Sequence, residues 1–134
     1  MKSVMTVNQL LFSTIGGLIG QVLGKVDGFV FALVVFVSID YLTGLMAAIV
    51  EKKLSSRIGF RGIFKKIVLF FLVAVGHIID TRLIQTGTSI RTAIIFFYLS
   101  NEGLSILENA VRIGLPIPRQ LKLILKQFKE DCDK

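Results

Sequence analysis

Acidic and amide side chains lie within apolar sequence at two places, and these are the residues of the chain best suited to a chemical role. The first is Asp40, the one charged residue in the 23-residue apolar segment 28–50. The second is a run with the spacing of one helix face: Asn101, Glu102, Ser105, Glu108 and Asn109. A carboxylate at the bilayer centre costs about 2.5–3.5 kcal/mol on insertion scales, so it requires a partner or a water-filled cavity. We therefore expect these side chains to face protein or water in an assembly.

Asp40 shares its predicted helix face with a small residue. Gly44 follows at i+4, where a glycine lets a neighbouring helix approach closely. A carboxylate in the middle of a helix has no free backbone N–H beside it, so we expect its partner on another element.

His77 and Asp80 form a second candidate pair, because residues at i and i+3 can touch. We interpret them as a hydrogen-bonded structural pair, with proton binding as the alternative.

The polar face of 101–109 has two interpretations. Against lipid tails its carboxylates and carboxamides would be strongly unfavourable, so we expect the face to contact protein or to line water once subunits assemble. The alternative is that this half leaves the membrane as an amphipathic surface helix, since Glu108 lies only four residues before Arg112. Neither interpretation assigns a catalytic residue.

Enzymatic, metal and cofactor chemistry find no support in the residue pattern. The sequence has no nucleophile and base arrangement, no cluster of metal-ligating residues and no phosphate-binding loop. The single cysteine, Cys132, excludes an internal disulfide and a thiolate metal site. The net charge of +7 is concentrated at the ends of apolar blocks, which is typical of membrane topology and lipid contact. We therefore expect no enzyme, no cofactor, no metal and no nucleic-acid partner.

The apolar blocks predict an all-α integral membrane protein. Apolar residues make up 53% of the 134-residue chain and the mean hydropathy is +0.74, which is high for a soluble domain of this size. Three blocks are predicted membrane spans, at 28–50, 67–81 and 92–111. A helix of 23 residues is about 34 Å long, against about 30 Å of hydrocarbon. Because no room is left for a second domain of ordinary size, we expect residues 1–134 to form one membrane domain.

Two further helices are predicted at the ends of the chain. Residues 8–24 form a glycine-rich helix in which Gly16, Gly20 and Gly24 recur every four residues. This spacing either makes a close-packing face or marks a flexible, weakly helical segment. The segment is short for a span and lacks a signal-peptide cleavage pattern, so we expect it to be retained, while its crossing of the membrane stays open. Residues 119–134 are predicted to form an amphipathic interfacial helix.

Basic residues set the expected orientation. Of the 16 lysines and arginines, six lie in the connector 51–66 and six lie from Arg112 onward. By the positive-inside bias, the connector and the C-terminus are cytoplasmic. We expect a turn and a short surface helix in the connector, whose cations contact lipid head groups: Lys52, Lys53, Arg57, Arg61, Lys65 and Lys66. The 15-residue span at 67–81 then has to thin the bilayer or rely on snorkelling cations.

Three stretches carry a resemblance to a known family. They are Asp40 to Ala48 (DYLTGLMAA), Lys52 to Gly62 (KKLSSRIGFRG) with Lys65 and Lys66, and Phe97 to Asn109 (FYLSNEGLSILEN) followed by Gly114 to Pro118 (GLPIP). In order and spacing they are similar to the toxin-secretion and phage-lysis holins of Gram-positive bacteria and their phages. The resemblance covers the chain from about residue 40 to the tail.

The resemblance implies a small homo-oligomeric protein of the bacterial cytoplasmic membrane. Such a protein accumulates there and, at a set time, opens lesions through which an endolysin or a toxin is released without being tightly bound. The residues alone leave two alternatives. A small proton-coupled transporter or ion channel would use Asp40 or the His77 and Asp80 pair. A structural membrane subunit would use its polar faces to bind a different protein.

Overall fold

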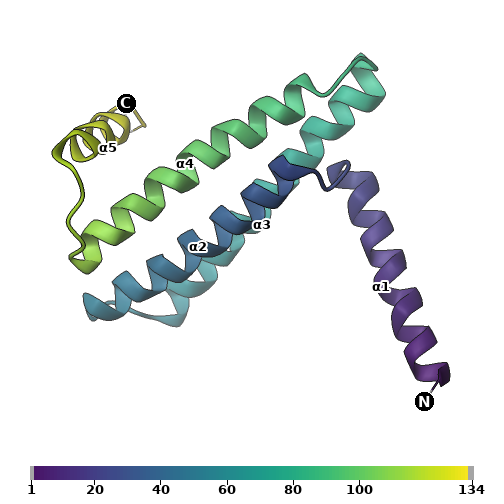
Figure 1. The fold of residues 1–134 in the computed structure, drawn as a ribbon, viewed down its shortest axis with the longest axis horizontal. Coiled ribbons are helices and arrows are strands. Elements are labelled where there is room, and N and C mark those ends of the chain that lie inside the picture. Colours follow the sequence, from purple (N-terminus) through teal and green to yellow (C-terminus); the bar gives the residue numbers. More distant parts are fainter. Residues whose placement is uncertain (1, 133–134) are drawn as a thin grey trace.

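The computed structural model describes residues 2–132, and every regular element in that range is a helix (Figure 1). The elements are α1 (Lys2–Leu23), α2 (Gly28–Val50), α3 (Ser56–Ile78), the π-helical turn η1 (Ile79–Ile84), α4 (Ser89–Ile113) and α5 (Arg119–Cys132). The predicted all-α class is therefore confirmed.

Side chains and a glycine define where the central helices begin and end. The Asp27 carboxylate accepts a hydrogen bond from Val30 N at 3.1 Å, and Ser55 Oγ accepts one from Ile58 N at 3.2 Å. Each bond satisfies an amide that has no partner inside its own helix. α4 ends before Gly114, whose φ of 105° lies in the left-handed region that glycine adopts without strain.

The helices α2, α3 and α4 form one packed unit. α2 packs along α4, and α3 lies against the same helices (Figure 1). Their shared core is aliphatic: Val30, Leu33, Val37, Leu69, Val73 and Ile95. α1 meets this unit near Leu23, which packs against the core, and then splays away from it. α5 follows the turn after α4. The unit of three helices is therefore the scaffold that positions the polar residues.

Two of the described helices are long and apolar enough to cross a membrane. They are α2 and the continuous helix from Ser56 to Ile84 that α3 and η1 form. Many of their outward side chains are large and apolar, for example Phe31 and Phe71, which are 66% and 63% exposed. A surface of this kind suits contact with lipid tails better than contact with water.

α3 differs most from its predicted form. We predicted a turn, a short surface helix and then a span at 67–81, but one helix begins at Ser56 and runs through the basic residues without a break. Lysine and arginine are good helix formers, so a basic run does not end a helix. The other boundaries move less: α1 begins at Lys2 and α4 at Ser89, each a few residues earlier than predicted. α5 begins at the predicted Arg119, and the last two residues of that predicted helix lie outside the described residues.

Gly76 brings α3 and α4 into close contact, and a side chain there is expected to be destabilising. A Cβ at Gly76 would lie 2.7 Å from Ile94 Cδ1 and 3.2 Å from the Arg91 Cα. Gly76→Ala should therefore lower the free energy of unfolding by about 1–3 kcal/mol, the usual cost of overpacking. Thermal unfolding in detergent, followed by circular dichroism, measures the change. Gly103→Ala is the matched control, because its Cβ would meet Phe36 at an ordinary 3.6 Å; equal melting temperatures for the two variants would contradict this prediction.

Candidate functional site

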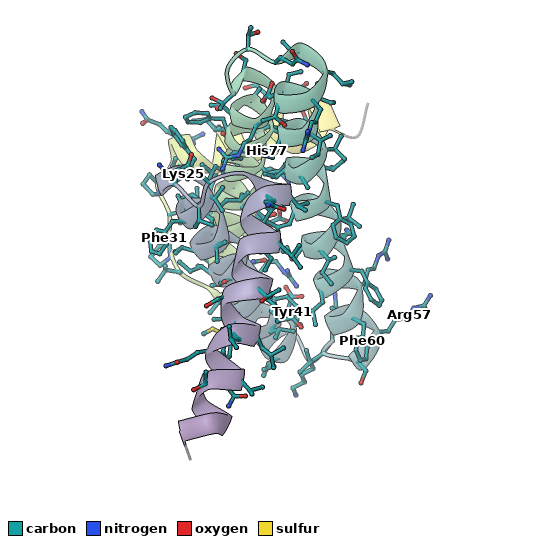
Figure 2. The ribbon with its side chains drawn as sticks, turned by 90° about the vertical axis from the view of Figure 1, so that its right-hand side faces the viewer. Lys25, Phe31, Tyr41, Arg57, Phe60 and His77 are labelled. Atoms are coloured by element: carbon teal, nitrogen blue, oxygen red, sulfur yellow. The ribbon has the colours of Figure 1, made fainter. Side chains whose placement is uncertain are left out.

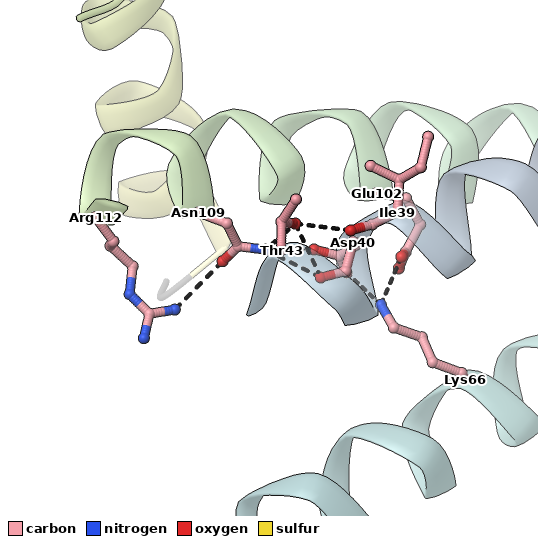
Figure 3. A network of polar contacts seen from close by, with 7 residues as sticks. All are labelled: Ile39, Asp40, Thr43, Lys66, Glu102, Asn109 and Arg112. Carbon is pink, nitrogen blue, oxygen red and sulfur yellow. Dashed lines mark hydrogen bonds and ion pairs between the residues drawn. The ribbon is translucent and has the colours of Figure 1, made fainter. Parts of the chain in front are cut away.

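A single ammonium group joins the three central helices. Lys66 on α3 donates from Nζ to Asp40 Oδ2 on α2 and to Glu102 Oε2 on α4 (Figure 3). The side chains of Asp40 and Glu102 are 8% and 5% exposed, and that of Lys66 is 19% exposed. These three residues, called the charge cluster below, therefore lie largely buried between the three helices.

Asn109 extends the charge cluster along α4. Its Nδ2 donates to Asp40 Oδ1 at 2.9 Å, to the Asp40 carbonyl at 3.1 Å and to Thr43 Oγ1 at 3.0 Å. Its Oδ1 accepts from Arg112 Nη1 at 3.2 Å, which orients the amide (Figure 3). Gly44 lies beside it, since a Cβ there would stand 3.6 Å from Asn109 Nδ2. Asp40 is therefore held from both α3 and α4.

The charge cluster contains two carboxylates and one ammonium. Each carboxylate would cost several kcal/mol if it were buried alone, and the shared lysine offsets this cost for both. Asp40 also accepts a hydrogen bond from the Asn109 amide, whereas Glu102 accepts its hydrogen bond from Lys66. Because the three charges come from three helices, they meet only when the helices adopt one register. The cluster therefore selects which helix faces pack together.

Arg91, near the start of α4, forms a second buried polar cluster at the other end of the unit. Its Nε donates to the Leu23 carbonyl at 2.9 Å and its Nη2 to the Lys25 carbonyl at 2.8 Å. Its Nη1 pairs with Asp27 Oδ2 at 3.0 Å. Figure 2 shows Lys25 at the same end of the molecule as His77. One guanidinium thus ties the loop between α1 and α2 to α4.

Asp80 and His77 do not form the predicted pair. The carboxylate oxygens of Asp80 accept backbone amides of α4, from Ile90 N at 3.1 Å and from Arg91 N at 2.8 Å. The first amides of a helix lack intrahelical partners and attract a carboxylate. The π-helical turn η1 also begins between the two residues and changes their regular helical alignment. His77 Nδ1 is buried and has no hydrogen-bond partner among the described residues.

Comparison with known proteins relates this sequence to a family. Residues 17–130 match the model of the bacteriophage holin family. The chain belongs to the bacteriophage holin family. A probable holin of Bacillus phage phi105 is 38% identical over 95 residues, which cover 71% of this chain and 70% of the relative. An uncharacterized protein of Listeria monocytogenes is 46% identical over 113 residues, covering 84% and 80% of the two chains. One of Clostridium perfringens is 44% identical over 116 residues, covering 86% and 87%. No solved structure matches the chain significantly.

Membership of the holin family confirms the resemblance carried by the three sequence stretches. All three lie within the matched residues, and the match also includes the end of α1. Together with the two apolar helices, membership supports a membrane protein.

Lys66 is not the lipid-facing cation that we predicted. It lies in the middle of α3 and points toward the other two helices, whereas Arg57, Arg61 and Lys65 are exposed. Two buried carboxylates attract the ammonium more strongly than a hydrated surface does. The sequence contained a signal for this arrangement: a 15-residue span at 67–81 is too short for a bilayer, and extending it toward the N-terminus includes Lys66.

The predicted polar face of α4 divides into two parts. Glu102 and Asn109 are buried and bind residues of the same chain, and Asn101 and Ser105 are partly buried. Glu108 is exposed. The buried part therefore finds partners within one chain of this holin-family protein. Contact of the remaining part with water or with other subunits stays a prediction.

The glycine series of the N-terminal helix is interrupted at its end. Gly24 lies beyond α1 with a φ of 86°, and a Cβ there would stand 2.8 Å from His77 Nδ1 and 2.9 Å from Arg91 Nε. The prediction that Gly24 belongs to the helix-packing face is wrong, because this glycine makes the turn after the helix. Gly16 and Gly20 do lie in α1, and a Cβ on either would meet no atom within 4 Å. Their face is open in the single chain.

Arg91 and Asp27 are the polar residues that sequence reasoning missed. We assigned a role to neither residue from the sequence. A signal was present, because Asp27 directly precedes the first apolar block and Arg91 the third. The first and third of three consecutive spans run in the same direction, so opposite charges at their starts are candidates for a pair, but the pairing also depends on how the helices pack.

Asp27 is expected to make folding stability depend on acidic pH. The Arg91 guanidinium hydrogen-bonds the carboxylate and holds the pKa of Asp27 below its ordinary value of 3.8. A lowered pKa in the folded state adds stability above the unfolded-state pKa, and this stability is lost as the pH falls through the folded-state value. The stability difference between the parent and Asp27→Asn should therefore be constant from about pH 7 to about pH 5 and narrow below about pH 4. Thermal unfolding in detergent across this range measures it, and a difference independent of pH would contradict the pairing.

Proposed function

We propose that this protein is a holin, which accumulates in the bacterial cytoplasmic membrane, assembles with copies of itself and opens lesions that release an endolysin or a toxin. The observation that carries the proposal is the charge cluster inside a helical unit whose outer surface suits lipid. Membership of the bacteriophage holin family and the similarity to a probable holin of a Bacillus phage support it. The proposed role needs no catalytic residue, cofactor or metal.

Three membrane spans are part of this proposal. α4 is less apolar than α2, but its buried acid, Glu102, forms an ion pair with Lys66. The 25 residues of α4 make a helix about 38 Å long, which is enough to cross a bilayer. We propose that α2, α3 with η1, and α4 each cross the membrane. Ion pairs at the two ends of the unit support this arrangement. At one end Arg112 binds Glu51 through two hydrogen bonds of 3.0 Å, and at the other end Arg91 binds Asp27.

The end that carries Glu51 and Arg112 is proposed to face the cytoplasm. The connector 51–66 and the chain from Arg112 onward each hold six of the 16 basic residues. The Arg112 guanidinium lowers the pKa of Glu51, so this carboxylate is ionised at cytoplasmic pH. The start of α2 then lies at the outer face, where α1 either turns back across the membrane or remains outside.

Subunits are proposed to associate through surfaces that are open in the single chain. Gly16 and Gly20 expose backbone on one face of α1, which favours close helix contact in lipid. Glu108 is exposed on α4, and we place it on the surface that lines water or meets other subunits after assembly. In this proposal the charge cluster keeps each subunit rigid while the open surfaces find partners.

Induced expression in a bacterium tests the proposal. We expect an abrupt loss of viability after a delay, together with release of a cytosolic enzyme such as β-galactosidase. Gly20→Leu should at least about double the delay or abolish release, because the larger side chain blocks close helix approach while membrane abundance is unchanged. Leu18→Ile, a change of shape without added bulk on the same helix, is the control and should release at the parental time.

Other outcomes would favour the alternative functions. Harmless expression at a normal membrane level would favour a structural subunit. Loss of ion gradients without enzyme release would favour a small channel or transporter. Equal timing for Gly20→Leu and Leu18→Ile would remove the glycine face of α1 from the mechanism.

A further inference from the structure

A groove runs along α3 and α4. It has a volume of about 980 Å³, and both helices contribute to its lining, which includes Lys66 and Glu102 of the charge cluster. Three exposed cations of α3 follow one another along it at four-residue spacing, so they share one helix face: Arg57, Arg61 and Lys65. They are called the basic row below.

The basic row concentrates positive charge on one face of α3. None of the ion pairs between described residues includes one of its three cations. The neighbouring Lys66 is bound to Asp40 and Glu102 and so neutralises those acids rather than the row. Figure 2 shows Arg57 projecting outward from the first turns of α3. A ligand at this end of the groove is therefore expected to carry negative charge.

An apolar row lies beside the basic row and continues toward the middle of α3. It runs from Phe60 through Phe64 and Val68 to Leu72, again at four-residue spacing, and all four side chains line the groove and are exposed. At about 1.5 Å per residue, this row is about 18 Å long. The hydrocarbon of one leaflet is about 15 Å thick. The groove thus combines a cationic end with an apolar wall about as long as one lipid chain.

We propose that this groove binds one anionic phospholipid, with its phosphate on the basic row and an acyl chain along the apolar row. Such a lipid supplies the negative charge and the apolar chain in one molecule. A second copy of the chain fits less well, because two facing α3 helices would bring their basic rows together. The inference rests on the membrane location of the protein and not on lesion formation, so it stands or fails separately from the release experiment.

Lipid retention by the full-length protein tests this site. After extraction from vesicles of phosphatidylglycerol and phosphatidylcholine, native mass spectrometry should detect one phosphatidylglycerol on each chain. Each cation near an anionic lipid strengthens lipid binding about fivefold, so replacing the three cations of the basic row should weaken phosphatidylglycerol binding about 100-fold. The test variant combines Arg57→Gln, Arg61→Gln and Lys65→Gln. The control variant removes the same charge from α5 through Arg119→Gln, Lys122→Gln and Lys126→Gln, and should retain lipid as the parent does.

A second variant tests the apolar row without changing charge. Val68→Trp fills the groove next to the acyl chain and should lower phosphatidylglycerol retention at least about tenfold, with helical content unchanged by circular dichroism. Parental retention by the basic-row variant, or an equal loss in the α5 control, would overturn the proposal. A crosslinking measurement gives a further outcome that would overturn the proposal. Two copies that carry Phe64→Cys and Cys132→Ser would form a disulfide equally with and without phosphatidylglycerol if a second copy occupied the groove.

Discussion

Lys66→Met is expected to destabilise the three-helix unit by about 3–5 kcal/mol, the usual cost of removing one partner from a buried ion pair. Methionine keeps the bulk of the side chain but leaves Asp40 and Glu102 without their shared ammonium. Since small proteins are stable by only about 5–15 kcal/mol, the loss is a large part of the total. Denaturant unfolding in detergent, followed by circular dichroism, measures it, and immunoblotting of membranes reports how much of the variant accumulates.

The neighbouring residue provides the control for this prediction. Lys65→Met removes the same charge from an exposed position and should change stability by less than about 0.5 kcal/mol. Adding Asp40→Asn and Glu102→Gln to Lys66→Met should restore at least about half of the lost stability, because no unpaired charge then remains buried. If Lys66→Met and Lys65→Met unfold at the same denaturant concentration, Lys66 does not hold the helices together.

Arg91→Met is expected to release the loop between α1 and α2 and to cost about 2–4 kcal/mol. Three groups lose a charged donor: the carbonyls of Leu23 and Lys25, and the Asp27 carboxylate. A hydrogen bond to a charged group contributes about 1.5–3 kcal/mol, but Asp27 is partly exposed and regains water, which reduces the total. Trypsin in detergent should cut the variant after the exposed Lys25 at least about tenfold faster than the parent. The reason is that local opening of the loop between α1 and α2 then costs less free energy.

Two matched variants separate loop release from a general loss of charge. Arg82→Met removes an exposed cation from η1 and should leave cleavage after Lys25 unchanged. Arg91→Lys keeps the charge but loses the forked geometry that reaches three acceptors, so it should fall between the parent and Arg91→Met. Parental cleavage in Arg91→Met would show that the loop is held by other contacts.

The parts of the fold that could be predicted are those governed by local sequence. α2 occupies the predicted residues, because Asp40 is the only charged residue in its apolar run and Asp27 caps its start. α3 could not be delimited in the same way, since we treated its basic residues as a boundary although they continue the helix. The π-helical turn η1 was not predictable either, because its sequence carries no signal that distinguishes it from an α-helix.

The candidate site shows the same division between local and long-range information. The cost of a carboxylate in apolar sequence predicted that Asp40 and Glu102 need partners. It did not identify Lys66, because the partner is 26 residues from Asp40 and 36 from Glu102 and depends on the register between helices. Local spacing misled us for His77 and Asp80, where the free amides of another helix bind the carboxylate instead.

The charge cluster also bears on how the protein enters a membrane during synthesis. The ribosome delivers its members in the order Asp40, Lys66 and Glu102. In the proposed membrane arrangement, the hairpin formed by α2 and α3 contains an acid and its base as soon as both helices have left the ribosome. The pair then lowers the cost of transferring both charges into lipid together. α4 arrives last, and its carboxylate joins an ammonium that is already in place. A nascent chain that ends after α3 therefore keeps a complete ion pair, whereas a chain that lacks α3 presents two unpaired acids to the insertion machinery.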